Sequence, residues 1–289
     1  MRGTAVKALL FGAYGQLGMA IVDAAVVSGL TLECAPRTLD VTDHPGVTAL
    51  IEASRPEWMI NCAAMTNVDG AHENPQLAMA VNAMGPANIA RAAQSVGARM
   101  IQISTEAVFD GERTEPYSEA DVCRPVSVYG VSKHAGELLV RVMNPESFVL
   151  RTSWLYSGNA GMNFPTRLLE QLSAHDHPVS VVTDVVGNPT PTTVLAEAVI
   201  ALITRPPEPG TYHACCMGSV SKYDWAVEIA QRNGFDPSRI VRVTSDNYPT
   251  VALRPKHVDL NCEKFMAARI YELPGWRDAY RKNWSPSGV

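Results

Sequence analysis

Tyr129 and Lys133 are the residues of this sequence whose types and spacing are best suited to proton transfer. They lie four positions apart, and residues at this spacing share one face of a helix. A free tyrosine, with a pKa of about 10, is a poor acid at neutral pH. A lysine cation beside the phenol favours the phenolate. The pair is therefore predicted to handle a proton at a reacting carbonyl group, with Tyr129 protonating the alkoxide.

A hydroxyl group completes such a site, because a donor must stabilise the oxyanion that develops on the carbonyl oxygen. Ser104 and Thr105 stand together at the carboxyl end of the predicted strand Met100–Ser104, and either can supply this group. A Tyr-x-x-x-Lys sequence by itself occurs often by chance on ordinary surface helices. Its position after a glycine loop and after a strand that ends in Ser-Thr indicates a reductase-type site.

The glycine loop is the segment Gly12-Ala-Tyr-Gly15-Gln-Leu-Gly18, between an apolar run and a predicted helix. In such a loop Gly12 permits the tight turn, Gly15 lets the backbone approach a pyrophosphate, and Gly18 lets the helix pack on the strand. The N–H groups and the positive dipole end of the helix then face the phosphates. The Gly-x-x-Gly-x-x-Gly spacing is a variant used by short-chain reductases. The sequence therefore predicts a dinucleotide site, where Lys133 can hydrogen-bond the nicotinamide ribose.

The end of the second predicted strand bears on which dinucleotide binds. An acidic residue for the adenosine ribose is expected there, but the sequence reads Ala35-Pro36-Arg37. Arg37 can hold a 2′-phosphate, which favours NADPH; a solvated loop arginine is the alternative, and NADH stays open. Asp40 and Val41 are expected to border the adenine, and 61–64 to flank the cofactor.

These residues need a scaffold, and strands and helices alternate through the first half of the chain. Short apolar runs indicate buried parallel strands, and apolar residues three to four positions apart indicate helices. The predicted strands are Ala5–Phe11, Thr31–Ala35, Trp58–Cys62, Met100–Ser104 and Phe148–Arg151. The predicted helices are Gln16–Ser28, Val47–Ser54, Ala78–Val96, Val131–Val142, Val194–Ile203, Tyr223–Arg232 and Cys262–Ala268.

This alternation predicts an α/β fold, a Rossmann-type doubly wound parallel sheet with a smaller mixed α/β substrate domain at its carboxyl edge. We expect residues 1–152 to form the dinucleotide-binding domain, completed by a segment near 187–204. Residues 153–289 are expected to form mainly the substrate-binding domain. Prolines and glycines interrupt this second part, so its elements are less sharply defined by the sequence.

The composition excludes several classes of protein. The 289 residues are 46% hydrophobic and 18% charged, as in an ordinary globular protein. A net charge of -5 gives no electrostatic footprint for nucleic acid or an anionic membrane. No apolar run approaches the ~20 residues that cross a bilayer, and the N-terminus does not resemble a signal peptide. The six cysteines lack a zinc-finger spacing, so buried reduced thiols in a cytoplasmic protein are expected.

Several motifs together resemble the dTDP-4-dehydrorhamnose reductase family, a branch of the extended short-chain dehydrogenases/reductases. They are Gly12–Gly18, Asn61–Asp69, Ser104–Gly111, Tyr129–Glu137, Arg151–Trp154, Asn163-Phe164, Gly187–Thr190 and Arg254-Pro255. The resemblance covers essentially the whole chain and implies reduction of the 4-keto group of a nucleotide-linked 4-keto-6-deoxyhexose.

The resemblance also implies roles for individual residues. Thr105 stabilises the oxyanion, Tyr129 donates the proton and Lys133 is its partner. The motifs and the resemblance together place these residues against the cofactor: Gly12, Gly15, Gln16, Leu17, Gly18, Arg37, Asp40, Val41, Ala63, Ala64, Met65, Thr66, Tyr129 and Lys133. The residues expected against the substrate are Glu106, Trp154, Asn163 and Arg254.

Three positions depart from the family's pattern. The family usually has Ser-Thr-Asp-Tyr-Val-Phe where this sequence reads Ser-Thr-Glu106-Ala107-Val-Phe. The longer Glu106 shifts a carboxylate that contacts substrate, and Ala107 removes an aromatic ring from the sugar pocket. Val185 stands where the family usually carries glutamine. These changes predict an altered sugar specificity around an intact catalytic set, so the keto sugar and its nucleotide stay open.

Other interpretations also stay open. A 4,6-dehydratase or an epimerase shares the Tyr/Lys pair but retains its dinucleotide, and a regulatory subunit binds a dinucleotide without catalysis. Arg254 can neutralise a diphosphate bidentately or form a surface salt bridge. His175 and His177 lack a third ligand nearby, so no metal is expected. The expected partner is a nucleotide-sugar substrate, with the protein a monomer or a homodimer.

Overall fold

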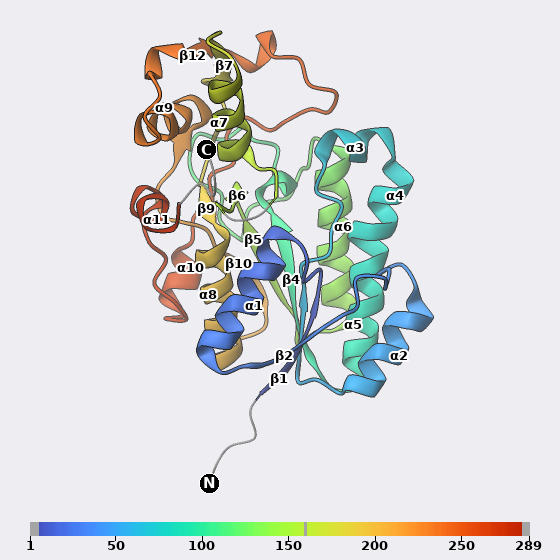
Figure 1. The fold of residues 1–289 in the computed structure, drawn as a ribbon. Coiled ribbons are helices and arrows are strands. Elements are labelled where there is room, and N and C mark those ends of the chain that lie inside the picture. Colours follow the sequence, from blue (N-terminus) through green and yellow to red (C-terminus); the bar gives the residue numbers. More distant parts are fainter. Residues whose placement is uncertain (1–5, 159–160, 285–289) are drawn as a thin grey trace.

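A six-stranded sheet forms the centre of the computed structural model, which describes residues 6–158 and 161–284 (Figure 1). Its strands are β1 (Lys7–Phe11), β2 (Thr31–Cys34), β3 (Trp58–Asn61), β4 (Arg99–Thr105), β5 (Phe148–Thr152) and β10 (Gly210–His213). They lie in the order β10-β5-β4-β3-β1-β2, and all neighbours are parallel. The chain turns to one side after β1 and to the other before β3, which creates a switch point where such folds bind ligands. The predicted doubly wound sheet is confirmed.

Helices cover both faces of the sheet, and the residues of β1 show why. Ala8 and Leu10 belong to one buried cluster, together with α1 (Gln16–Ser28) and α8 (Thr192–Thr204). Leu9 and Phe11 belong to a second cluster, together with α2 (His44–Ser54) and α5 (Gly85–Ser95). Successive side chains of a strand point to opposite faces, so a strand that is apolar throughout must be covered on both.

A second group of elements lies over the carboxyl ends of the strands, at the top of Figure 1. It contains α7 (Phe164–Ala174), α9 (Lys222–Arg232) and the parallel pair β7 (Val179–Val182) and β12 (Ile240–Val243). Two shorter pairs are β6 (Leu155–Tyr156) with β9 (Thr190–Pro191), and β8 (Val186–Gly187) with β11 (Val220–Ser221).

Further helical elements lie along the rest of the described chain: α3 (Val68–Glu73), α6 (Val128–Met143), α10 (Glu263–Ala267), α11 (Trp276–Asn283) and the short turns η2 (Glu106–Val108), η3 (Pro237–Arg239) and η4 (Ser245–Asn247).

The single helix predicted over Ala78–Val96 is wrong in one respect. The structure has α4 (Pro75–Met79), a π-helical turn η1 (Ala80–Met84) and then α5. Pro86 lacks the N–H that a continuous α-helix needs at this point, and the N–H of Gly85 bonds to the carbonyl of Ala80, five residues back. Such π turns occur often at functional sites, and this one carries the buried Asn82.

Part of the second half of the chain returns to the sheet. β10 pairs with β5, and α8 lies against α1. The buried cluster that contains Ala8 also contains Tyr280 of α11, so one core extends through both halves. The division into two domains near residue 152 stays a prediction.

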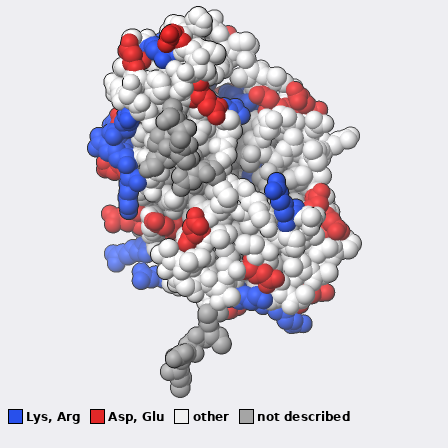
Figure 2. Space-filling model, viewed as in Figure 1, with Lys and Arg blue, Asp and Glu red and all other residues white. Residues whose placement is uncertain are grey.

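The distribution of surface charge and the apolar character of the helices concern two expected absences, binding of nucleic acid and insertion into a membrane. On the face drawn in Figure 2, acidic and basic side chains are interspersed. Within the described ranges, no helix combines the length and the apolar character needed to cross a bilayer.

Candidate active site at the carboxyl edge of the sheet

A cavity of about 800 Å³ opens where the glycine loop faces the second half of the chain. The predicted site residues that line it are Gly12, Gly15, Gln16, Leu17, Gly18, Ala64, Thr66, Thr105, Glu106, Tyr129, Lys133, Trp154, Asn163 and Arg254. The predicted residues outside its lining are Arg37, Asp40, Val41, Ala63 and Met65. The structure therefore brings the glycine loop, the proton-transfer candidates and the expected substrate residues to one space.

The glycine loop has the shape of a diphosphate cradle. Gly12 has a φ of +79°, and a Cβ there would lie 2.5 Å from the backbone nitrogen of Ala63. A Cβ on Gly18 would lie 2.1 Å from the carbonyl oxygen of Gly12. Both positions therefore require glycine. Gly15 is the N-cap of α1 and makes no side-chain cap, so the first N–H groups of the helix are available to an anion.

The residues expected at the adenosine end differ in exposure and in their contacts. Arg37 is exposed, and its guanidinium carbon lies 5.9 Å from the ring centroid of Tyr14 in the glycine loop. Asp40 is also exposed and accepts a hydrogen bond from the N–H of Thr42 at 2.9 Å. Val41 is buried and packs in the core cluster of α2 and α5. Arg37 is therefore the charged side chain of this group that contacts the loop.

Asn82 was not predicted from the sequence, although it supports the expected cofactor wall. Its amide oxygen accepts from the N–H of Met65 at 2.8 Å, and its amide nitrogen donates to the Met65 carbonyl at 3.0 Å. The same nitrogen lies 3.0 Å from the hydroxyl of Ser132 on α6. The signal available in the sequence was an asparagine within an alanine-rich helix, and this helix also contains Asn88. The π turn thus holds the 63–66 loop against α6.

The two hydroxyls at the end of β4 have different partners. Ser104 donates to the carboxylate of Glu137, which lies on α6. Thr105 donates to the carboxylate of Glu106 at 2.7 Å and lies within hydrogen-bonding reach of the Tyr129 hydroxyl. Of the two candidates left open by the sequence, Thr105 is the one that lies beside the tyrosine.

Tyr129 and Lys133 lie on the first turns of α6, where the Ser127 side chain caps the helix by accepting from the N–H of Gly130. Burial and then the Glu106 carboxylate raise the pKa of Tyr129, against a hydrogen bond with Thr105. Lys133 Nζ donates to the carbonyl of Ile103 at 2.7 Å, and the expected effect of the lysine and of an oxidised nicotinamide on the phenol stays a prediction. The tyrosine is therefore held as the neutral phenol, the form that can donate a proton.

Burial lowers the pKa of Lys133 to about 8, while Glu137 and Cys62 act in the opposite direction. Its stem is enclosed beside the cavity. A buried ammonium with one carbonyl acceptor retains two further N–H donors. Lys133 can therefore hold a hydroxyl-bearing ligand in the cavity.

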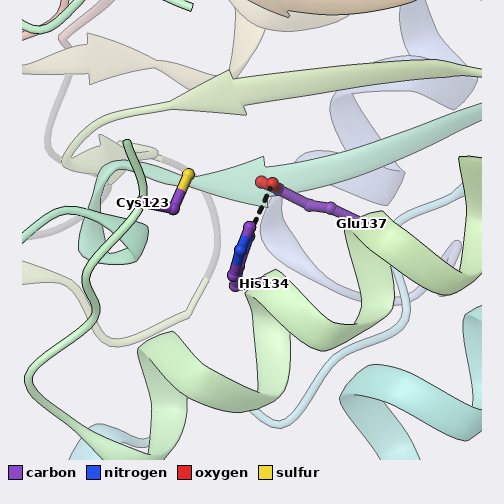
Figure 3. A group of neighbouring side chains, drawn as sticks. All are labelled: Cys123, His134 and Glu137. Atoms are coloured by element: carbon purple, nitrogen blue, oxygen red, sulfur yellow. Dashed lines mark hydrogen bonds and ion pairs between the residues drawn. The ribbon is translucent and has the colours of Figure 1, made fainter. Parts of the chain in front are cut away.

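Glu137, Cys123 and His134 lie close enough together to suggest a metal site (Figure 3). The carboxylate of Glu137, however, already accepts from Arg151 Nε at 2.9 Å and from Arg151 Nη2 at 2.7 Å. Burial alone would raise the pKa of Glu137, but hydrogen bonds from His134 and Arg151 hold it at about 2. The guanidinium thus supplies the positive charge that a cation would bring. We interpret the cluster as a support for β4.

The expected substrate residue Trp154 follows β5 in a strained conformation, with a φ of +42°. Its ring stacks on Trp225 of α9 with the centroids 5.7 Å apart. A Cβ on Gly187 would lie 2.5 Å from the indole, so glycine is needed for the ring to lie there. A non-glycine residue in this region costs energy, and the enclosing contacts hold the indole on the cavity wall.

Asn163 and Arg254 reach the cavity with their polar groups already engaged. Asn163 caps α7 and donates to the Gln16 amide oxygen at 3.1 Å. Arg254 Nη2 lies 3.0 Å from the carboxylate of Asp69 at the start of α3. The salt bridge that the sequence left as an alternative for Arg254 is therefore present, and the residue also lines the cavity.

Comparisons with known proteins add independent information. Residues 6–286 match the family model described as the RmlD substrate binding domain. The chain is 37% identical over 277 residues to a dTDP-4-dehydrorhamnose reductase of Mycolicibacterium smegmatis, over 95% of this chain and 84% of that protein. It is 35% identical to the dTDP-4-keto-6-deoxy-D-glucose reductase of Streptomyces niveus, over 94% of each. The crystal structure of a dTDP-4-dehydrorhamnose reductase from Bacillus anthracis in complex with NADP matches with a TM-score of 0.91 and 31% identity, over 97% of this chain and 99% of that one.

Proposed function

We propose that this chain, which belongs to the dTDP-4-dehydrorhamnose reductase family, uses NADPH to reduce the 4-keto group of a nucleotide-linked 4-keto-6-deoxyhexose. One observation carries the proposal: Thr105, Tyr129 and Lys133 share one cavity with the glycine loop. The family supplies the class of substrate, and the cavity supplies the groups that this chemistry requires.

The residues present suit NADPH both at its diphosphate and at its two riboses. The cradle at Gly12 and Gly18, which a Cβ would fill, and the N-terminus of α1 suit a diphosphate. Lys133 would hold the nicotinamide ribose, and Arg37 beside Tyr14 would bind the 2′-phosphate that distinguishes NADPH from NADH. NADPH supplies the hydride when it is bound.

The protein's part of the reaction is to bind the carbonyl and to deliver a proton. When the substrate binds, the Thr105 hydroxyl would turn its single proton from Glu106 to the carbonyl oxygen, and Tyr129, within hydrogen-bonding reach of Thr105, would donate to the same oxygen. As negative charge develops on this oxygen, Tyr129 transfers its proton to it. The raised pKa of Tyr129 keeps the phenol protonated until that moment. Thr105 would hold the product oxygen during this transfer, and the tyrosinate would then take its proton back from solvent that enters the cavity.

The variant Tyr129→Phe tests this assignment. It removes the proton donor and leaves the ring, so we expect kcat to fall by at least ~10³-fold. The Kd for NADPH, measured by fluorescence titration, is expected to stay within about twofold. Undiminished turnover in this variant would exclude Tyr129 as the donor.

The wild-type stoichiometry is measured with a panel of nucleotide-linked 4-keto sugars. A reductase consumes one NADPH for each sugar reduced, which is followed as loss of NADPH absorbance. A dehydratase or an epimerase converts its sugar without net consumption of added NADPH. Conversion of that second kind would overturn the proposed function while leaving the cofactor site intact.

A further inference from the structure

Lys222, the first residue of α9, has a place in the cavity that no motif predicted. Its ammonium nitrogen lies 3.6 Å from the ring centroid of Trp154, 4.5 Å from that of Phe164 and 5.3 Å from that of Trp225. The backbone N–H of Lys222 donates to the Val185 carbonyl at 2.8 Å. The helix start is thereby anchored, and the side chain extends along the aromatic wall of the cavity.

The ammonium of Lys222 differs from the other cations of the cavity in what it contacts. Arg254 pairs with Asp69, Lys256 pairs with Asp184, and Lys133 donates to a backbone carbonyl. Among the described residues, no hydrogen bond or ion pair engages Lys222 Nζ. Aromatic faces attract a cation but leave its N–H donors unused. The lysine therefore presents donors to whatever enters the cavity.

Glu106 supplies the opposite charge. Burial lowers the pKa of Lys222 to about 7, and the Glu106 carboxylate acts against this shift. Burial in turn raises the pKa of Glu106, against its hydrogen bond with Thr105 and its attraction to Lys222. Whether the proton lies on the lysine or on the glutamate, the pair together carries no net charge. Such a pair is suited to an uncharged polar group that both donates and accepts.

We propose that Lys222 is a substrate-binding, specificity-determining residue, whose amine donates to the sugar hydroxyl next to the reduced carbonyl while Glu106 accepts from the same hydroxyl. The proposal rests on the proposed function. In a 4-keto-6-deoxyhexose this hydroxyl is the one on C3, because C5, the other neighbour of C4, carries the methyl group and no hydroxyl. The carbonyl oxygen bound by Thr105 would lie beside Glu106, because the Thr105 hydroxyl contacts that carboxylate at 2.7 Å. The neighbouring C3 hydroxyl would then lie within reach of Glu106, whose carboxylate attracts the Lys222 ammonium in the same cavity.

The alternative role for Lys222 is purely structural, in which its charge only holds the indole of Trp154 in place. The two roles predict different effects on kcat/KM when the amine is removed, depending on the substrate. A hydrogen bond to the C3 hydroxyl is lost only by a substrate that has this hydroxyl. A displaced Trp154 would impair every sugar to the same extent.

The test compares Lys222→Met with wild type on a nucleotide-linked 4-keto-6-deoxyhexose and on its 3-deoxy analogue. Methionine keeps an apolar stem against the rings and removes the amine. We expect kcat/KM for the hydroxylated sugar to fall at least tenfold, as for a lost hydrogen bond to a charged donor. The value for the 3-deoxy analogue is expected to stay within about twofold, and so is the Kd for NADPH, which also reports that the variant is folded.

Lys264→Met is the matched control. Lys264 is exposed, lies 4.3 Å from the ring centroid of Tyr212 and donates to the Thr211 carbonyl, outside the cavity lining. The same chemical change there should leave both sugars unaffected. An equal loss on both sugars in Lys222→Met, or no loss on either, would overturn the proposal.

Calorimetry measures binding of the two reaction products, the sugar nucleotides with a 4-hydroxyl group and either a C3 hydroxyl or none. Binding needs no turnover, so this experiment separates the subsite proposal from the proposed function. A preference for the C3 hydroxyl that disappears in Lys222→Met supports the subsite even if NADPH is not oxidised. Absence of NADPH oxidation by wild type would overturn only the function. Equal binding of both sugars by wild type would overturn the subsite.

Discussion

At the scale of single residues, two adjacent hydroxyls at the end of β4 have different hydrogen-bond partners and therefore different expected roles. Ser104 is buried and donates to Glu137 beneath the site, whereas Thr105 lies between Glu106 and Tyr129. Successive side chains of a strand leave on opposite faces. One hydroxyl therefore supports the scaffold, while the other lies beside Tyr129, where the proposed function places the carbonyl oxygen.

This division predicts different outcomes for two conservative variants. Thr105→Val keeps the shape and removes the oxyanion donor, so kcat should fall about 10²–10³-fold with little change in stability. Ser104→Ala should leave kcat nearly unchanged and lower the free energy of unfolding by about 1–3 kcal/mol, because a buried hydrogen bond to a charged group is lost. Steady-state kinetics and urea unfolding on both variants check this. The reverse pattern would assign the oxyanion to Ser104.

At the scale of elements, Glu137 and Arg151 tie α6 to β4 and β5. The pair is buried, with Arg151 Nη2 at 2.7 Å from the carboxylate. The pKa of Glu137 is lowered from 4.5 to about 2 by hydrogen bonds and charge that outweigh burial. A lowered carboxyl pKa contributes stability that is complete above the unfolded value and is lost as the pH falls toward the folded value. The tie should therefore weaken in acid.

We expect the free energy of unfolding to lose about 3 kcal/mol from this group between roughly pH 5 and pH 2. Urea unfolding at a series of pH values measures the slope. Glu137→Gln should be less stable at pH 7 by about 3–5 kcal/mol, because Arg151 is left buried without its partner. The variant should also show a shallower loss toward acid, and an unchanged slope would rule out this group as its source.

The contact between α6 and the π turn η1 gives a second prediction at this scale. A Cβ on Gly136 would lie 2.2 Å from the carbonyl oxygen of Asn82, a backbone atom that cannot move freely. Glycine to alanine inside a helix ordinarily stabilises by up to about 1 kcal/mol. Gly136→Ala should instead destabilise the protein and weaken NADPH binding, because Asn82 holds Met65.

Gly275→Ala is the control, since nothing lies within 4 Å of a Cβ at that position. Thermal unfolding and NADPH titration are measured on both variants. A stabilised Gly136→Ala protein would show that α6 and η1 do not pack as closely as described.

At the scale of the whole molecule, the core joins the two halves of the chain. One buried cluster extends from Ala8 of β1 to Tyr280 of α11. The Asn163 side chain bonds to Gln16 in the glycine loop, 147 positions away. Domains that share a core unfold together. The cofactor half and the substrate half are therefore expected to melt as one unit.

Differential scanning calorimetry should show a single transition, and NADPH should move all of it. At a concentration of 100 times its Kd, a ligand stabilises the folded state by about 2.7 kcal/mol. For a chain of this size that corresponds to a rise in Tm of about 4 °C. Two transitions, of which NADPH moves only one, would show that the halves are thermodynamically separate.

The sequence alone determined the features that depend on local geometry. The glycine loop is readable because close backbone contacts at Gly12 and Gly18 admit no side chain. The shared face of Tyr129 and Lys133 follows from the helical repeat. Strand β1 is readable because an apolar run of its length has few alternatives. These features predicted the sheet, which the structure confirms, and the Tyr129/Lys133 pair, whose role in proton transfer is the proposal above.

Features that depend on residues far apart in the chain came from the folded structure. It placed Thr105 beside Tyr129 and gave the Ser104 hydroxyl a different partner, Glu137 on α6. It brought Lys222 to Glu106 and Trp154, none of which is near it in sequence. It raised the pKa of Tyr129 through burial and through the Glu106 carboxylate, neither of which the spacing of Tyr129 and Lys133 reveals. Burial and long-range contacts arise only once the chain has folded, and no local pattern encodes them.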